Sequence, residues 1–317
     1  MKAVLVLRAL GLGDFLTALP ALRALGTALP AHRRLLAMPA ALAPLARIAG
    51  VADEIIDARP LAPLPPLAAP PAVAVNLHGR GPQSHRVLLA TRPRRLVAFA
   101  HPDVPETAGA PVFRERDHTV QRWCHLLEAY GIAADATRLE LLPPGGRLPA
   151  APPAIACGAT LIHAGAASGA RRWPAERFAA VARAERGAGR RVILTGGADE
   201  RPLALSIAHA AGLDEAAVFA GRTSVVELTA LVAVAGRVVC GDTGVAHLAT
   251  ALRTPSVVLF GPISPALWGP PVDRPWHRAL WAGRTGDPHA ARLDAGLSMI
   301  GVADVLAALE GVVEAAA

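Results

Sequence analysis

The sequence predicts an α/β protein with two doubly wound parallel-sheet domains that face a cleft. Three observations support this fold class: apolar runs of strand length, helical patterns that alternate with them, and a proline-rich segment that divides the series in two. A chain of 317 residues is long for one hydrophobic core and suits two domains of roughly 150 residues. Two such lobes imply a cleft between them.

The first half of the chain begins with an entirely apolar strand at 3–7, which leads through two glycines into a helix with leucines at helical spacing. The same alternation continues, with expected strands at 34–38, 53–57, 72–77 and 95–99, and expected helices at 40–49, 82–91 and 117–130. Strands that lack an alternating polar face are typical of a parallel sheet covered by helices on both sides.

The segment "LLPPGGRLPAAPPA" is rich in proline and glycine and is the predicted linker. It divides the chain into domains 1–150 and 151–317. The second domain repeats the pattern, with strands at 159–163, 191–195, 237–240 and 256–260, and helices at 174–187, 200–211, 224–235 and 244–252. A region without a clear pattern then precedes a last helix at 301–314. One option for this helix is to pack back onto the first domain.

The composition excludes several classes of protein. A hydrophobic content of 53% with 18% charged residues excludes disordered and fibrous chains, and no apolar run reaches the roughly 18 residues of a membrane span. The N-terminus imitates a signal peptide, but Arg8 and Asp14 interrupt its apolar run too early. Cys124, Cys157 and Cys240 include no close pair and are predicted to be buried thiols, so a cytoplasmic location is expected.

Ligands of open α/β sheets bind beyond the carboxyl ends of the strands, where helix N-termini present unpaired amides. The first turn of this kind is "GLGDF" at 11–15, which invites a dinucleotide fingerprint. Leu16 stands in the place of the third glycine and no acidic residue ends the second strand, so NAD is rejected. Asp14 is expected to begin the helix, either as an N-cap or as a catalytic carboxylate.

The second turn is "HAGAASGARRWP" at 163–174, where small residues precede Arg171 and Arg172. Backbone amides and an arginine fork suit a phosphate, and the alternative is a flexible loop with solvated arginines. The third turn, 195–200, ends in Glu200, which could reach a ribose hydroxyl or stabilise the helix N-terminus. The fourth contains Gly241, Asp242, Thr243 and Gly244, followed by His247. Taken singly, Asp242 and Thr243 suit helix caps, and His247 suits a satisfied core histidine.

Together these motifs resemble glycosyltransferase family 9, the ADP-heptose-dependent heptosyltransferases. The most specific is "GDTGVAHLATAL" through "LFGP" at 241–262, and the next is "LGLGDFLTALPAL" at 10–22. Further matches are "HTVQR" at 118–122, "RRWPAERF" at 171–178, "LTGGADE" at 194–200 and "AGRTSVVEL" at 220–228. The resemblance implies the GT-B architecture of two Rossmann-like lobes, with the acceptor bound by the first lobe and the sugar nucleotide by the second.

The resemblance also implies roles for individual residues. It makes Asp14 the general base of an inverting transfer. It assigns to the donor Ser168, Arg171, Glu200, Asp242, Thr243, Gly244 and His247, with Glu200 on the ribose and Asp242 shaping the turn. It assigns to the acceptor Gly13, His78, His118 and Arg122.

Two departures from the family pattern concern these sites. Family members commonly have lysine where Arg171 stands. The usual Asp-Leu-Gln-Gly is here Asn76-Leu77-His78-Gly79, so an acidic group is missing near the acceptor. The departure at Asn76 bears on the identity of the acceptor more than on donor binding.

The predicted function is inverting, metal-independent transfer of a heptose, or a related sugar, from an ADP-sugar to a hydroxyl of a saccharide, glycolipid or natural product. No Asp-x-Asp occurs in the chain, so a metal-bridged diphosphate lacks its usual ligands, and no metal or other cofactor is expected. The family default for the acceptor is the lipopolysaccharide core. The alternatives are a transferase of another nucleotide sugar and a non-catalytic protein that binds nucleotide sugars.

The net charge of +7 is almost entirely arginine, which with abundant alanine, proline and glycine indicates a GC-rich genome, and no nucleic-acid partner is predicted. Residues 59–101 contain six arginines and no acidic residue. Two interpretations stay open: solvated side chains, or a patch that attracts an acidic acceptor or an anionic membrane surface. The second interpretation corresponds to a cytoplasmic protein at the inner face of the membrane.

Overall fold

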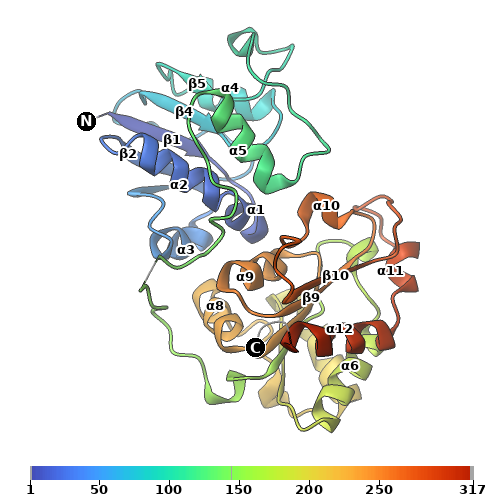
Figure 1. Cartoon of the computed structure of the whole chain (residues 1–317). Helices are drawn as coiled ribbons and strands as arrows, with labels where there is room; N and C mark the ends of the chain where they lie inside the picture. The colour runs from blue at the N-terminus through green and yellow to red at the C-terminus, as the bar shows by residue number, and fades with distance from the viewer. Residues whose placement is uncertain (1, 144, 315–317) are drawn as a thin grey trace. The chain divides into compact units, whose positions relative to one another are not determined.

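The computed structural model describes residues 2–143 and 145–314 (Figure 1). The chain forms two compact units, Met1–Gly146 and Arg147–Ala317. Each unit contains one sheet of five strands in which all the paired strands are parallel. The predicted α/β class with doubly wound parallel sheets is therefore confirmed.

Unit 1 has the strand order β3-β2-β1-β4-β5. Its strands are β1 Ala3–Leu7, β2 Arg33–Met38, β3 Glu54–Asp57, β4 Val73–Asn76 and β5 Leu96–Val97. Its helices are α1 Leu12–Thr17, α2 Leu19–Ala28, α3 Ala43–Ile48, α4 Gln83–Leu89 and α5 Thr119–Ala129. The expected first helix is divided at Ala18, because Pro20 near the start of α2 cannot donate a main-chain hydrogen bond to the preceding turn.

Unit 2 has the strand order β10-β9-β8-β6-β7. Its strands are β6 Thr160–His163, β7 Val192–Thr195, β8 Arg237–Gly241, β9 Ser256–Phe260 and β10 His277–Trp281. Its helices are α6 Ala175–Gly187, α7 Arg201–Ala211, α8 Val225–Val234, α9 Gly244–Leu252, α10 Pro265–Trp268, α11 Ala295–Met299 and α12 Val302–Glu314. Every residue of β9 is buried, which explains the uninterrupted apolar run that predicts it.

Strand β10 and helices α10 and α11 lie in the region where the sequence shows no clear pattern. β10 stands at the end of the strand order beside β9, and its second and third residues, Arg278 and Ala279, are exposed. An edge strand of this kind needs no continuous apolar run, and so it escapes a prediction based on apolar periodicity.

The last helix, α12, packs within its own unit. Val305, Leu309 and Val312 are buried in the hydrophobic core of unit 2, and α12 lies beside α6 and the β9–β10 edge (Figure 1). The apolar side of α12 is therefore buried in unit 2.

One cysteine prediction is wrong: Cys124 and Cys240 are buried, but Cys157 is exposed. Among the described residues, no helix combines the length and apolar character that crossing a membrane requires.

Candidate active site

Two segments meet at the carboxyl ends of the central strands of unit 1. β1 is followed by residues 8–11 and α1, and its neighbour β4 is followed by the turn at 77–82. The chain leaves these strands toward opposite sides of the sheet, because β2 pairs beyond β1 and β5 pairs beyond β4. Such a switch point is where open α/β sheets bind their ligands.

Arg8 is a buried charge at this switch point, with 1% of its surface exposed. Its Nε donates to the carbonyl oxygen of Asp14 at 2.8 Å, and its Nη2 donates to Asp14 Oδ1 at 3.2 Å. Further hydrogen bonds run to the carbonyl oxygen of Leu77 and to the hydroxyl of Thr17. Burial lowers the pKa of Arg8 to about 10, so the guanidinium stays charged at neutral pH.

Arg8 is a site residue that the sequence motifs do not reveal. Its contacts come from α1, from the turn after β4, and from α5, whose Trp123 ring centre lies 4.9 Å from the guanidinium carbon. The signal in the sequence is a lone arginine directly after an apolar strand and six residues before an aspartate. A charge that becomes buried at such a position requires an opposite charge or several acceptors.

Asp14 is the third residue of α1, and the N-cap interpretation of Asp14 is wrong. The N-cap is Gly11, which has no side-chain capping bond. Because α1 begins at Leu12, Asp14 lies in the first turn, where the helix dipole favours a carboxylate. Its side chain is 29% exposed, so the carboxylate is held by Arg8 and still reaches solvent. Gly13 precedes it in α1 and is half-buried.

His78 lies close to both of these charges. Burial lowers the pKa of His78, the charge of Arg8 lowers it further, and Asp14 opposes the shift. The imidazole is therefore neutral at pH 7. Its Nδ1 is buried and has no hydrogen-bond partner among the described residues. A neutral imidazole with an unsatisfied nitrogen suits a hydroxyl group of a ligand.

Asn76, which stands where the family pattern has aspartate, shapes the turn that carries His78. The side chain is fully buried, and its Oδ1 accepts a hydrogen bond from the main-chain nitrogen of His78 at 2.9 Å. Its Nδ2 donates to the carbonyl oxygen of Gly79 at 3.1 Å and to Ser84 Oγ at 2.9 Å. The amide is thus used within the turn, and an aspartate could not make the two donations.

His118 and Arg122 belong to the start of α5. His118 is the N-cap residue, and its Nδ1 accepts a hydrogen bond from the main-chain nitrogen of Val120 at 3.3 Å. Arg122 donates to three main-chain carbonyls of residues 114–117 and lies 4.6 Å from the ring centre of Phe113. Burial lowers the pKa of Arg122, and its charge contributes to the lowered pKa of Arg8. Arg122 therefore holds the loop before α5, and His118 caps the helix itself.

In unit 2 the corresponding switch point lies between β6 and β8, since β7 pairs beyond β6 and β9 pairs beyond β8. Residues 164–171 follow β6, and residues 242–243 connect β8 to α9. Arg171 Nη2 lies 2.9 Å from Asp242 Oδ2, and it also donates to the carbonyl oxygen of Asp242. The two predicted turns are thus brought together, although 71 residues separate this pair.

The Arg171–Asp242 pair is unequal in burial. The side chain of Asp242 is 8% exposed and that of Arg171 is 23% exposed. Burial raises the pKa of Asp242, and the charge and hydrogen bond of Arg171 oppose this shift. Arg171 Nε is buried and has no hydrogen-bond partner within the described part of the chain. Asp242 therefore orients a guanidinium whose donors are not all used.

The helix-cap interpretation of Asp242 and Thr243 is also wrong for their side chains. Thr243 has the N-cap position of α9, but its side chain makes no capping hydrogen bond. Its Oγ1 is buried and has no partner among the described residues except a weak contact with the Cys240 thiol. The first amides of α9, beginning with Gly244, therefore receive no capping bond from the N-cap side chain, and uncapped amides at a helix N-terminus can bind an anion.

His247 is the fourth residue of α9 and is half-buried. Its ring centre lies 6.0 Å from that of Trp268 in α10, at an interplanar angle of 63°. The ring thus has a packing partner one helical turn beyond Gly244. This contact supports a structural contribution and leaves a role toward the donor as a prediction.

Glu200 stabilises the turn after β7, as one of its two interpretations expects. Its Oε2 accepts a hydrogen bond from the main-chain nitrogen of Gly197 at 2.7 Å. Its carboxylate also covers Gly165, where a Cβ atom would lie 1.8 Å from Oε1. A side chain at position 165 would therefore require the carboxylate of Glu200 to move.

His163 is a second residue that the motifs do not single out. Its Nδ1 lies 3.2 Å from Thr195 Oγ1, and its Nε2 lies 4.0 Å from Glu200 Oε2. Burial lowers the pKa of His163, and Glu200 opposes the shift. The carboxyl ends of β6 and β7 thus form one polar cluster around Glu200.

Ser168 belongs to the small-residue loop after β6. Its Oγ donates to the carbonyl oxygen of Pro288 at 2.6 Å. Ala170 donates through its main-chain nitrogen to the carbonyl oxygen of Ala290 at 2.9 Å. The loop that contains Ser168 is therefore held by residues 287–294, which argues against the flexible-loop interpretation.

Throughout the described ranges, no three His, Cys, Asp or Glu residues form a group that could hold a metal ion.

Comparison with known protein families shows to which family the chain belongs. The model of glycosyltransferase family 9 (heptosyltransferase) matches residues 111–290, which is more than half of the sequence. The chain belongs to glycosyltransferase family 9. The resemblance stated from the motifs is therefore confirmed, and the matched range includes both turns that Arg171 and Asp242 join.

The relatives of this family 9 chain include lipopolysaccharide heptosyltransferase 3 of Escherichia coli, which is 33% identical over 147 residues. That match spans 44% of this chain and 42% of the relative, so it covers less than half of either protein. Among solved structures, E. coli ADP-heptose lps heptosyltransferase II superposes with a TM-score of 0.73 at 21% identity and covers 99% of both chains. E. coli heptosyltransferase WaaC with ADP has a TM-score of 0.71 at 16% identity, over 98% of this chain and 100% of that one. These structures share the GT-B fold with this chain.

Proposed function

We propose that this family 9 chain catalyses metal-independent transfer of a heptose from ADP-heptose to a hydroxyl of a saccharide or glycolipid, with inversion at the anomeric carbon. The observation that carries the proposal is the joining of Arg171 to the Asp242–Gly244 turn at the N-terminus of α9. An oriented guanidinium beside unpaired helix amides is a site for a diphosphate. The ADP bound in the structure of the E. coli relative supports the choice of nucleotide.

The donor residues act on the leaving group. Arg171, the amides at Gly244 and the hydroxyl of Thr243 bind the diphosphate, and His247 lies one helical turn farther along α9. Negative charge grows on the diphosphate as its bond to the anomeric carbon breaks, so fixed donors of this kind stabilise the transition state. Ser168 belongs to the same loop as Arg171, and Glu200 accepts hydrogen bonds from the ribose hydroxyls.

The acceptor residues act on the incoming hydroxyl. Asp14 takes the proton as the acceptor oxygen forms its bond to the anomeric carbon, on the face opposite the departing diphosphate. The electron pair of the broken bond leaves with ADP. Attack from the opposite face accounts for the inversion. Arg8 holds the carboxylate of Asp14 in one orientation. Gly13, His78, His118 and Arg122, all in unit 1, bind the acceptor.

We propose a cytoplasmic location and no resident metal. A lipopolysaccharide-type saccharide is the acceptor class that the names of the relatives favour. The arginines between 59 and 101 are all exposed: Arg59, Arg80, Arg86, Arg92, Arg94 and Arg95. This exposure is compatible with contact with an anionic membrane surface. Vesicle sedimentation with and without anionic lipid tests this contact.

Calorimetry with ADP tests donor binding and the absence of a metal together. ADP is expected to bind equally well with and without EDTA, because the charge of the diphosphate is neutralised by Arg171 and helix amides. Arg171→Ala is expected to weaken ADP binding by about 1.5 to 3 kcal/mol, the range of a hydrogen bond to a charged group. Arg278→Ala, an exposed arginine on β10, is the matched control and is expected to leave the affinity unchanged. An affinity that collapses on chelation would contradict metal independence, and tighter binding of UDP or GDP would favour another nucleotide sugar.

Substitution of His247 separates a role toward the donor from a packing role. His247→Ala is expected to lower ADP affinity by about 1 kcal/mol, the typical contribution of one hydrogen bond, and to lower the melting temperature no more than loss of the ring contact with Trp268 does. The measurement is ADP affinity and melting temperature on the same preparation. Trp268→Leu, which removes only the ring partner, is the matched control. A lower melting temperature with unchanged ADP affinity would show that His247 is a core residue.

A further inference from the structure

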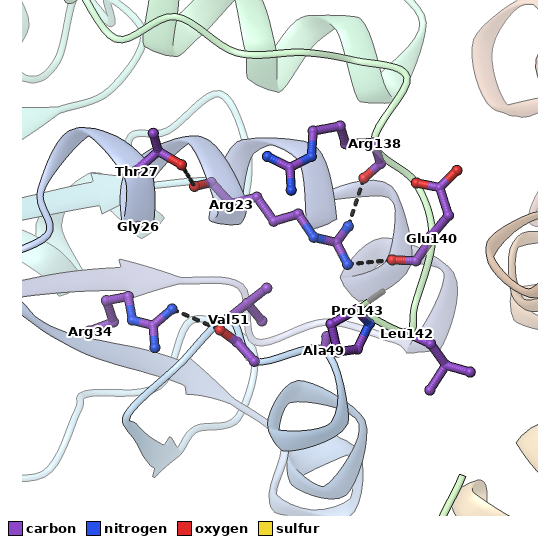
Figure 2. Close-up of a pocket in the computed structure, with 11 residues that line it drawn as sticks. Arg23, Gly26, Thr27, Arg34, Ala49, Val51, Arg138, Glu140, Leu142 and Pro143 are labelled. Atoms are coloured by element: carbon purple, nitrogen blue, oxygen red, sulfur yellow. Dashed lines mark hydrogen bonds between the residues drawn. The ribbon is translucent and has the colours of Figure 1, made fainter. Parts of the chain in front are cut away.

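Unit 1 contains a pocket of about 580 Å³ that is separate from the Asp14 site (Figure 2). Its walls come from the second half of α2, the start of β2, the residues after α3 and the segment 138–143. The start of β2 is the amino end of a strand, whereas Asp14 follows the carboxyl end of β1. In a parallel sheet these ends lie at opposite edges, so the pocket is not part of the proposed acceptor site.

Arg34 is the most firmly held charge of this pocket. Its Nε and Nη2 donate to the two carboxylate oxygens of Asp53 at 3.1 and 2.6 Å, and its Nη1 donates to the carbonyl oxygen of Gly50 at 2.7 Å. Gly26 of α2 lies beside its guanidinium, where a Cβ atom would be in ordinary contact at 3.4 Å from Nη1. Three of the five N–H groups are thus used for orientation, and two are left for a ligand.

Arg23 and Arg138 bring two further positive charges to the lining of the pocket. Arg23 donates to the carbonyl oxygens of Arg138, at 2.7 Å, and Glu140 (Figure 2). Burial lowers the pKa of Arg23, the charge of Arg138 lowers it further, and Glu140 opposes the shift. The side chain of Arg138 is exposed and makes no hydrogen bond or ion pair within the described residues. An anion between these guanidinium groups would relieve their repulsion.

The rest of the pocket suits a small polar skeleton. The hydroxyl of Thr27 and the carboxylate of Glu140 are polar groups on its rim, and Val51 and Leu142 add apolar surface. The volume is within the range of small-molecule sites and much larger than a single phosphate needs.

We propose that this pocket binds a sugar phosphate, with the phosphate held by Arg23, Arg34 and Arg138 and the sugar against Thr27, Glu140 and Val51. Arginine forks match the oxygens of a phosphate monoester, and the adjacent carboxylate and hydroxyl match sugar hydroxyls. The segment that carries Arg138 continues directly to the boundary of unit 1 at Gly146. A ligand in the pocket would therefore hold this segment against α2.

The test is calorimetric titration of the full chain with glucose 6-phosphate, inorganic phosphate and glucose. All titrations use the Arg171→Ala background, so that phosphate binding by unit 2 does not contribute. Glucose 6-phosphate is expected to bind with one-to-one stoichiometry and at least tenfold more tightly than either inorganic phosphate or glucose. Arg138→Ala is expected to weaken this binding roughly tenfold to a hundredfold, the effect of one charge-assisted hydrogen bond.

Arg94→Ala is the matched control, because Arg94 is an exposed arginine of unit 1 outside the pocket. The affinity of this variant for glucose 6-phosphate is expected to be unchanged. Absence of saturable binding, or an equal loss in Arg94→Ala and Arg138→Ala, would overturn the site. Equal affinity for inorganic phosphate would overturn the assignment of the sugar. Arg138 is exposed, so its substitution is expected to leave the melting temperature unchanged. The outcome is independent of whether Asp14 and Arg171 perform glycosyl transfer.

Discussion

Asp14→Asn is expected to lower the rate of glycosyl transfer by roughly a hundredfold to ten-thousandfold, the range for loss of a general base. Asparagine keeps an oxygen that can accept the hydrogen bond from Arg8 Nη2, but it cannot take the proton of the acceptor hydroxyl. ADP binding is expected to be unchanged, because the proposed diphosphate residues belong to unit 2. The measurement is transfer to a verified acceptor, together with ADP affinity.

Asp14→Ala separates the kinetic role from the structural one. Because Asp14 is not the N-cap, its removal costs no capping bond, and the loss of stability comes from Arg8, whose buried charge loses its carboxylate partner. Removing one partner of an ion pair, so that the other charge stays buried without compensation, typically lowers the free energy of unfolding by about 3 to 5 kcal/mol. Asp14→Asn is expected to cost less, since the hydrogen bond is retained. Near-normal transfer by a folded Asp14→Asn variant would remove Asp14 from the mechanism and favour a different base or a binding protein without catalysis.

Arg8→Met is expected to lower the free energy of unfolding of unit 1 by about 2 to 4 kcal/mol. Methionine fills part of the volume, but the carbonyl oxygen of Leu77 loses a donor and Trp123 loses the stacked guanidinium. The carboxylate of Asp14 also loses its positive neighbour. Transfer is expected to fall as well, with ADP affinity retained, because Arg8 positions Asp14 and does not contact the donor residues.

The matched control for Arg8 is Arg33→Met. Arg33 also forms an ion pair, with Glu54 at 2.9 Å, but both side chains are nearly half exposed. Exposed pairs of this kind contribute about 0 to 1 kcal/mol, so little change is expected. Denaturant unfolding of both variants measures the difference. Equal stability of Arg8→Met and Arg33→Met would show that the buried network around Arg8 is not important for unit 1.

Much of the fold follows from local features of the chain. The apolar runs that form β1, β8 and β9 are buried on both faces, and burial of this kind leaves a continuous pattern that can be read without a structure. The turns after these strands are equally local, since a strand, a few small residues and a helix start are consecutive in the sequence. The predicted turn at 241–244 therefore follows the carboxyl end of β8 as expected, and the segment 11–15 follows that of β1, although residues 12–15 already belong to α1.

The roles of particular side chains depend on contacts that the local sequence does not contain. Asp14 is a first-turn carboxylate and not a cap because α1 has its N-cap at Gly11, three residues earlier than expected. Its partner Arg8 is recognisable as a site residue only from its contacts with Leu77 and with the ring of Trp123. The pairing of Arg171 with Asp242 likewise spans 71 residues. Burial and distant partners decide which charges are held and which reach a ligand, because desolvation and hydrogen bonding act through space and not along the chain.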